Sequence, residues 1–198
     1  MGTRATVRWT LSPGAVAAWA LVLLLLLPAH AGAKTVEVQL DPAAGVCGVS
    51  GWFLAPVSVA VAWDVLTDYD HIPEYVHSMV ASHRERDAGG ALRVRQTASA
   101  GVFIFRRHMN VLLAIAETPH RRIAFHDVLG KDFEHYTGNW RIERISSGTR
   151  VSYSLAAEPK GALPRRMCRG ALRKSAASLL GQVRTEMLRR SKLAPRQP

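Results

Sequence analysis

The chain has 198 residues and a formal net charge of +11 at neutral pH, with 48% hydrophobic and 21% charged residues. This composition supplies a packed core, so it excludes a wholly disordered chain, and the length is that of one ordinary domain. Two cysteines exclude a disulfide-dense scaffold and a multi-cysteine zinc or iron–sulfur site.

The first residues have the order of a secretory signal peptide. Arg4 and Arg8 form a positive start, an apolar run of 13 residues ends at Leu27, and small residues follow. The run is shorter than the roughly 20 residues that span a bilayer. We therefore expect residues 1–33 to be a signal peptide and the mature protein to be periplasmic or secreted, with an uncleaved N-terminal anchor as the alternative.

The positive charge is concentrated near the C-terminus. Residues 34–159 carry 13 Lys and Arg against 14 Asp and Glu, whereas residues 160–198 carry 11 Lys and Arg against the single Glu186. The body is therefore nearly neutral and the last segment is a cationic strip. We expect one folded domain at residues 34–192, followed by a short basic tail at residues 193–198.

The folded body opens with a strand pattern. Residues 35–40 alternate in polarity, and residues 46–54 are apolar but contain Gly48 and Gly51. Glycine inside a strand often marks a bulge, so the pattern predicts one strand with a bend.

Two short helices are expected next. Residues 59–67 have helical spacing, and Ser58 before them is a suitable N-cap. Residues 70–73 contain a proline and interrupt the pattern. Residues 74–79 then predict the second helix.

A run of alternating segments separated by turn residues follows. Period-two alternation predicts strands with one buried and one wet face, and tight turns at this spacing predict an antiparallel meander. The expected strands cover residues 82–87, 92–98, 102–116, 121–129, 136–142 and 151–157.

Residues 165–190 contain no proline and predict a single long helix. Arg166, Arg173 and Arg184 flank its apolar stripe. The stripe has to pack on an apolar surface, and the concave face of the sheet is the available one. On a helical wheel the stripe covers an arc of about 120° and consists of Cys168, Leu172, Ala176, Leu179, Leu180, Val183 and Met187.

This order of elements resembles the helix-grip fold of the START-like (SRPBCC) superfamily, which includes the polyketide cyclase/dehydrase and lipid-transport families. The similarity is nearest to the coenzyme Q-binding START group and covers about residues 55–190. It implies an α+β fold in which a curved antiparallel sheet surrounds a long C-terminal helix, with two short helices after the first strand. The residues that carry the resemblance are 62–69 with 72–75, 130–133 with 136–140, and 148–153 with 158–159.

The resemblance implies a cavity between the sheet and the last helix that binds an apolar molecule, such as a quinone, an isoprenoid or another lipid. Ligand pockets are mostly apolar with a few orienting polar groups, which the predicted inward-facing residues would provide, although the same residues could simply pack against one another. We expect no cofactor and no metal. The candidate cavity residues are Phe105, Arg107, Met109, Phe125, Tyr136, Trp140, Tyr153, Leu172, Leu179 and Val183.

Arg107 is the charged residue in an otherwise apolar row that runs from residue 105 to residue 115. A buried guanidinium without a partner is costly, so it needs a carboxylate, a ligand headgroup or an exit to water. Our hypothesis is that Arg107 contacts the polar end of a bound ligand. A bulge at Arg106 and Arg107 that turns the side chain outward is the alternative.

The sequence offers less support for catalysis. It contains no G-x-S-x-G, H-E-x-x-H, P-loop or G-x-G-x-x-G motif. A cyclase/dehydrase that uses Glu74, Asp127 and Tyr136 as acid/base groups is the alternative function, and a scaffold acting through its surface is the third. We expect solvated histidines, and not a metal site, at the polar-face positions His108, His126 and His135.

Two features of the sequence have more than one interpretation. Cys47 and Cys168 form a disulfide in an oxidising compartment only if the fold brings them together. The basic last segment is either a solvated helix face or a docking strip for anionic lipid headgroups, with Arg166, Arg173 and Arg184 as its candidates. Nucleic acid is not an expected partner, because no aromatic residues interleave the arginines. The oligomeric state stays open.

Overall fold

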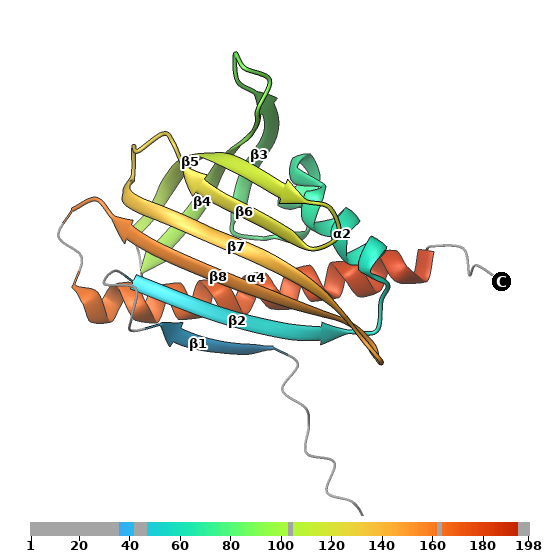
Figure 1. The fold of residues 1–198 in the computed structure, drawn as a ribbon. Helices are drawn as coiled ribbons and strands as arrows, with labels where there is room; N and C mark the ends of the chain where they lie inside the picture. Colours follow the sequence, from blue (N-terminus) through green and yellow to red (C-terminus); the bar gives the residue numbers. More distant parts are fainter. Residues whose placement is uncertain (1–35, 42–46, 103–104, 162–163, 194–198) are drawn as a thin grey trace, which may run out of the picture. The chain divides into compact units, whose positions relative to one another are not determined.

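The structure is a computed structural model that describes residues 36–41, 47–102, 105–161 and 164–193, apart from the side chains of residues 100–102, 105–107 and 165. Every described element belongs to one compact unit, Thr35–Pro198. The expected signal peptide lies outside the described residues. Figure 1 shows one antiparallel sheet of eight strands, in the order β1-β2-β8-β7-β6-β5-β4-β3, with the long helix α4 along one face.

The six-strand meander predicted from the alternation is confirmed. Consecutive strands from β3 to β8 pair antiparallel, and β2 then pairs with β8. The strands are β1 (Glu37–Asp41), β2 (Cys47–Ala55), β3 (Met79–Arg86), β4 (Leu92–Val102), β5 (Phe105–Thr118), β6 (Arg122–Asp127), β7 (Phe133–Ile145) and β8 (Gly148–Pro159).

The expected single bent strand at the start of the body is wrong. The structure has two strands, β1 and β2, which pair antiparallel with Asp41 opposite Gly48. Pro42 and Gly45 lie between them in the sequence. Proline lacks the N–H that a sheet ladder needs and glycine is typical of turns, so the sequence between the strands favours a change of direction. Two strands, and not one, therefore precede the short helices.

The first predicted helix is confirmed. Helix α2 spans Val59–Thr67, and the Ser58 hydroxyl accepts a hydrogen bond from the Val61 N–H at 3.2 Å. This bond satisfies one of the free N–H groups at the helix start.

The second short helix begins and ends earlier than the sequence suggests. The 3₁₀ turn η2 spans Tyr69–His71 and α3 spans Ile72–Tyr75, whereas Met79, expected in the helix, already belongs to β3. Pro73 lies in the first turn of α3. A proline there removes an N–H that would have no helical partner, so the residue that we interpret as an interruption is compatible with a helix start.

Helix α4 spans Arg165–Leu193 and packs its predicted stripe against β1, β2 and the short helices. Leu180 and Met187 are fully buried. At Gly51 the helix comes so close that a Cβ atom would lie 2.7 Å from the Leu180 Cδ1. In the part of the chain that the structure describes, no helix is long and apolar enough to cross a membrane.

A disulfide joins Cys47, the first residue of β2, to Cys168 in the first turn of α4. The two Cα atoms are 6.2 Å apart, within the usual range for a bridge. The pairing that the sequence leaves open is therefore present, and it fixes the start of α4 to the sheet.

Replacing both residues in a Cys47→Ser and Cys168→Ser variant is expected to lower the free energy of unfolding by about 2–4 kcal/mol, because the bridge restricts the unfolded chain over a long loop. Urea denaturation of the oxidised wild type and the variant measures this difference. Wild type treated with a reductant should match the variant. Equal stability of the oxidised wild type and the variant would contradict the expectation.

Candidate functional site

A cavity of about 110 Å³ lies between the sheet, the short helices and α4. Strands β4 to β8 form its floor, and the segment from η2 to the start of β3 forms one wall. Leu179 and Val183 of α4 close the cavity from the other side. The lining is apolar and aromatic except for tyrosine hydroxyls, the Trp140 indole N–H and the Gln96 amide.

The volume limits what fits in this state. An apolar protein cavity of roughly 150 Å³ holds benzene, and pockets for drug-sized molecules occupy about 300–1,000 Å³. The cavity thus accepts a group of the size of one ring, and a longer molecule requires its walls to move apart.

The structure brings six of the ten predicted cavity residues together: Phe125, Tyr136, Trp140, Tyr153, Leu179 and Val183 line the cavity. Leu172 packs against the core outside the lining, and Met109 is half-buried, also outside it. The side chains of Phe105 and Arg107 lie outside the described residues, so the hypothesis for Arg107 stays a prediction. The β4–β5 register runs through Arg106 and Arg107 without a shift, so the described backbone shows no bulge there.

Sequence reasoning missed the wall formed by η2 and α3. Tyr69, Ile72, Tyr75 and Val76 line the cavity from this segment. Tyr69, Ile72 and Tyr75 are spaced by three residues and Val76 comes four after Ile72, which places them on one face of a helical turn. This period was a usable signal, but it was obscured because we placed the helix at residues 74–79.

An aromatic surface covers the floor of the cavity. A Cβ atom at Gly138 would collide with the Phe125 ring and with the Ser154 carbonyl oxygen, so glycine there lets the ring lie against β7. The Phe125 ring centroid lies 6.1 Å from that of Tyr136 and 6.4 Å from that of Tyr153. Such distances are typical of favourable aromatic pairs.

The cavity's tyrosines stay protonated. Burial is the largest cause that raises the pKa of Tyr69 and Tyr75 above the ordinary tyrosine value, and for Tyr69 a hydrogen bond to Glu117 adds to it. Burial also raises the pKa of Tyr136 to about 12 and that of Tyr153 well above its ordinary value. The hydroxyls are therefore neutral hydrogen-bond donors near neutral pH.

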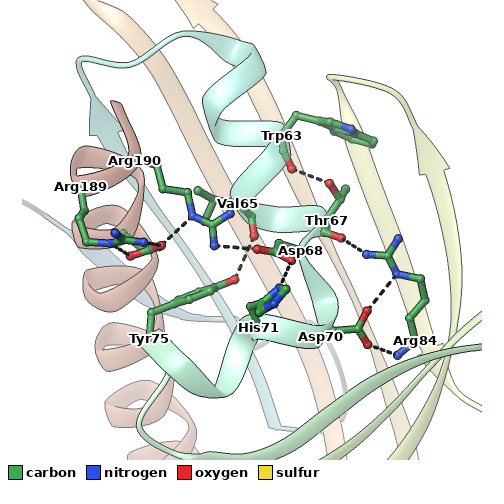
Figure 2. A network of polar contacts seen from close by, with 11 residues as sticks. Trp63, Val65, Thr67, Asp68, Asp70, His71, Tyr75, Arg84, Arg189 and Arg190 are labelled. Atoms are coloured by element: carbon green, nitrogen blue, oxygen red, sulfur yellow. Dashed lines mark hydrogen bonds and ion pairs between the residues drawn. The ribbon is translucent and has the colours of Figure 1, made fainter. Parts of the chain in front are cut away.

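A polar network at the edge of the cavity joins the short helices to the end of α4 (Figure 2). The Asp68 carboxylate contacts the His71 Nδ1 at 2.6 Å and the Arg190 guanidinium at 2.8 Å. Arg190 also contacts Glu186 at 2.7 Å, and Glu186 binds Arg189 at 2.7 Å. The guanidinium of Arg190 lies 5.8 Å from the centre of the cavity-lining Tyr75 ring.

The charges in this network stabilise one another. Burial disfavours ionisation of Asp68, but the hydrogen bonds from His71 and Arg190 outweigh it and lower the pKa of Asp68. The hydrogen bond to Asp68 raises the pKa of His71. The contact between these two side chains therefore stabilises the fold fully between the unfolded-state pKa of Asp68 and that of His71, and its contribution is lost as the pH falls through the folded-state pKa of Asp68. This contribution is also lost as the pH rises through the folded-state pKa of His71.

Asp68→Asn is expected to lower the pKa of His71 toward its ordinary value, whereas Arg190→Ala is expected to raise it further. The carboxylate favours the protonated imidazole and the guanidinium disfavours it. An NMR titration of the His71 ring in wild type and both variants measures the two shifts. Shifts of the same sign in the two variants would refute this description of the network.

The remaining predicted groups lie apart from the cavity. Asp127 accepts hydrogen bonds from the backbone N–H groups of Leu112, Leu129 and Gly130 at 2.9–3.1 Å. Glu74 is exposed, and so are the three histidines predicted on polar faces, His108, His126 and His135. Within the described residues, no group of three or more His, Cys, Asp or Glu side chains is arranged as a metal site.

Comparison with known protein families supports the fold described above. The family described as "Polyketide cyclase / dehydrase and lipid transport" matches residues 49–188. No curated protein matches the chain.

Several solved structures are similar. A STAR-related lipid transfer protein from Xanthomonas axonopodis is 15% identical with a TM-score of 0.62, over 79% of this chain and 95% of that one. Human STARD10 is 12% identical with a TM-score of 0.64, over 80% and 71%. The Zhui aromatase/cyclase from Streptomyces sp. R1128 is 15% identical with a TM-score of 0.57, over 78% and 95%. These similarities show the START-like helix-grip fold expected from the sequence.

Proposed function

Since the chain belongs to the polyketide cyclase/dehydrase and lipid transport family, we propose that it binds a hydrophobic small molecule in the cavity between the sheet and α4. The ligand class is quinone-, isoprenoid- or lipid-like, and quinone follows the resemblance to the coenzyme Q-binding group. The observation that carries the proposal is the cavity itself, whose apolar and aromatic walls come from the sheet, the short helices and α4. Such a lining favours burial of an apolar molecule.

A cyclase/dehydrase acting on an aromatic polyketide-like substrate is the second candidate. The fold that this chain shares with the Zhui aromatase/cyclase favours it. Of the proposed acid/base set, Tyr136 lines the cavity, while Glu74 is exposed and Asp127 is occupied by backbone N–H groups. With a pKa of about 12, Tyr136 is suited to donate a hydrogen bond, not to act as a general base near neutral pH. This chemistry favours the binding function.

Native mass spectrometry with organic extraction tests the binding function. Wild-type protein from its own host is expected to carry a stoichiometric apolar molecule. Leu179→Trp places a larger side chain in the cavity. The fraction of protein that carries the ligand should fall about tenfold, because the added ring occupies the space of the ligand. Ser178→Trp adds the same ring at an exposed position of α4 and should keep the ligand.

Two results would decide against the binding function. Equal occupancy in the Leu179→Trp and Ser178→Trp variants would place any bound molecule outside the cavity. Turnover of an aromatic polyketide-like substrate, lost in the Leu179→Trp variant, would establish the second candidate instead.

We also propose that the protein is exported to the periplasm or beyond the cell after removal of residues 1–33. The Cys47–Cys168 bridge supports export, because disulfides persist in oxidising compartments. The same mass spectrum tests cleavage, since the mature mass should lack these residues. A full-length mass would support the uncleaved anchor.

We propose that the start of α4 docks on membranes that contain anionic lipid. Arg166 and Arg173 are exposed, and Met167 between them is 44% exposed. Cationic side chains attract an anionic leaflet, and an exposed apolar side chain beside them can enter the headgroup layer. Arg184 is less available, because its Nε donates a hydrogen bond to the Leu54 carbonyl at 2.9 Å.

Reversing two of these charges, with Arg166→Glu and Arg173→Glu, is expected to weaken binding to vesicles of phosphatidylglycerol and phosphatidylcholine at least about tenfold, given roughly 1 kcal/mol per cation. Arg121→Glu with Arg144→Glu makes the same charge change at exposed positions of the sheet side and should weaken binding less. Sedimentation with vesicles measures both. Equal losses in the two variants, or no dependence on anionic lipid, would exclude a docking surface at α4.

A further inference from the structure

Four tyrosines line the cavity, and they divide into two pairs. The Tyr69 hydroxyl donates to the Glu117 carboxylate at 2.6 Å, and the Tyr75 hydroxyl donates to the Val65 carbonyl at 2.9 Å. The hydroxyls of Tyr136 and Tyr153 have no hydrogen-bond partner among the residues that the structure describes. The hydroxyls of Tyr69 and Tyr75 therefore donate to other groups of the protein, whereas, within the described part of the chain, those of Tyr136 and Tyr153 do not.

The unpaired hydroxyl of Tyr153 opens into the cavity. Throughout the described residues, every side-chain nitrogen or oxygen that is fully buried has a partner. A hydroxyl without one therefore borders space that at least a water molecule can enter. Tyr153 is only 6% exposed, and its ring packs at 4.5 Å from Trp140 and 6.4 Å from Phe125, both of which line the cavity.

A second, polar groove on the other side of the sheet also borders Tyr153. The lining of that groove includes Ser152 and Ser154, the neighbours of Tyr153 in β8, whose side chains point to the opposite face from Tyr153. Phe125 and Trp140, which contact the Tyr153 ring, do not line the groove. The ring therefore lies on the cavity side, and the backbone accounts for the contact with the groove.

Tyr136 and Tyr153 both pack against the ring of Phe125. This ring occupies the space over Gly138 between them. Along the β7–β8 ladder Tyr153 lies opposite Trp140 and Tyr136 lies opposite Ala157, so the two tyrosines are on the same face, four positions apart. The hydroxyls thus form a pair of neutral donors at the β7–β8 side of an otherwise apolar space.

We propose that these two hydroxyls select an apolar, ring-sized ligand group that carries at least one carbonyl oxygen, which accepts a hydrogen bond from Tyr136 or Tyr153. The inference rests on the proposed binding function and adds the ligand's polar chemistry to it. A ligand without an acceptor would displace water and leave the hydroxyls unpaired, which opposes its binding. A quinone ring is one group that has the required oxygens.

Acetophenone and α-methylstyrene test the proposal, because they differ only in an oxygen that replaces a CH₂ group. Calorimetry on the full protein gives the ratio of their affinities, and comparing this ratio between proteins removes their different hydration in water. At least one of the variants Tyr136→Phe and Tyr153→Phe should shift the ratio about tenfold toward α-methylstyrene, as expected for one lost hydrogen bond within the cavity. The affinity for α-methylstyrene itself should stay the same or increase.

Tyr75→Phe is the matched control. It removes a hydroxyl of the same cavity that already donates to Val65, so the affinity ratio should not change. Thermal unfolding of the Tyr136→Phe and Tyr153→Phe variants should match wild type, because neither lost hydroxyl bonds the protein.

The possible failures are distinguishable. If both probes bind wild type and the ratio is unchanged in Tyr136→Phe and Tyr153→Phe, the carbonyl selection is overturned and the binding function stands. If neither probe binds wild type but native mass spectrometry finds an apolar ligand, the ring-sized group is overturned and the binding function stands; if neither probe binds and no ligand is found, both proposals are contradicted. A change of the ratio in Tyr75→Phe as large as in the other variants would also overturn the assignment to Tyr136 and Tyr153.

Discussion

Helix α4 is attached to the rest of the fold at both of its ends. The Cys47–Cys168 bridge fixes its first turn to β2, and the ion pair between Arg190 and Asp68 fixes its last turns to the short helices. Between these points the helix meets the sheet closely at Gly51. The cavity lies where Leu179 and Val183 of the helix face strands β4 to β8.

The charges of the site and its apolar space are kept apart. The cavity lining has only neutral polar groups, whereas the carboxylates and guanidinium groups around Asp68 lie outside that lining, and the buried Glu186 among them is paired with Arg189 and Arg190. The wall between these regions is the short segment from Tyr69 to Tyr75, which consists of the turns η2 and α3 and whose two tyrosine hydroxyls donate to Glu117 and Val65.

Ligand binding and membrane docking, the two activities that we propose, depend on different parts of the chain. The nearly neutral body provides the apolar cavity on which the proposed binding function rests, and the cationic strip at residues 160–198 is where we propose contact with anionic lipid. The disulfide attaches the first turn of α4, which includes Arg166 of this strip, to β2.

The sequence alone determined the features that depend on local period and capping. Alternation predicted the six-strand meander, Ser58 marked the start of α2, and the apolar stripe of α4 identified Leu179 and Val183 as inward-facing. Tertiary structure alone decided the features that depend on what lies opposite: the pairing of β1 with β2, the Cys47–Cys168 bridge, and the position of the η2–α3 face against the cavity. It also decided which tyrosine hydroxyls find a partner within the protein. A sequence pattern records which face of an element is buried, because burial repeats with the period of the element. It does not record the partner on that face, because the partner comes from a distant part of the chain.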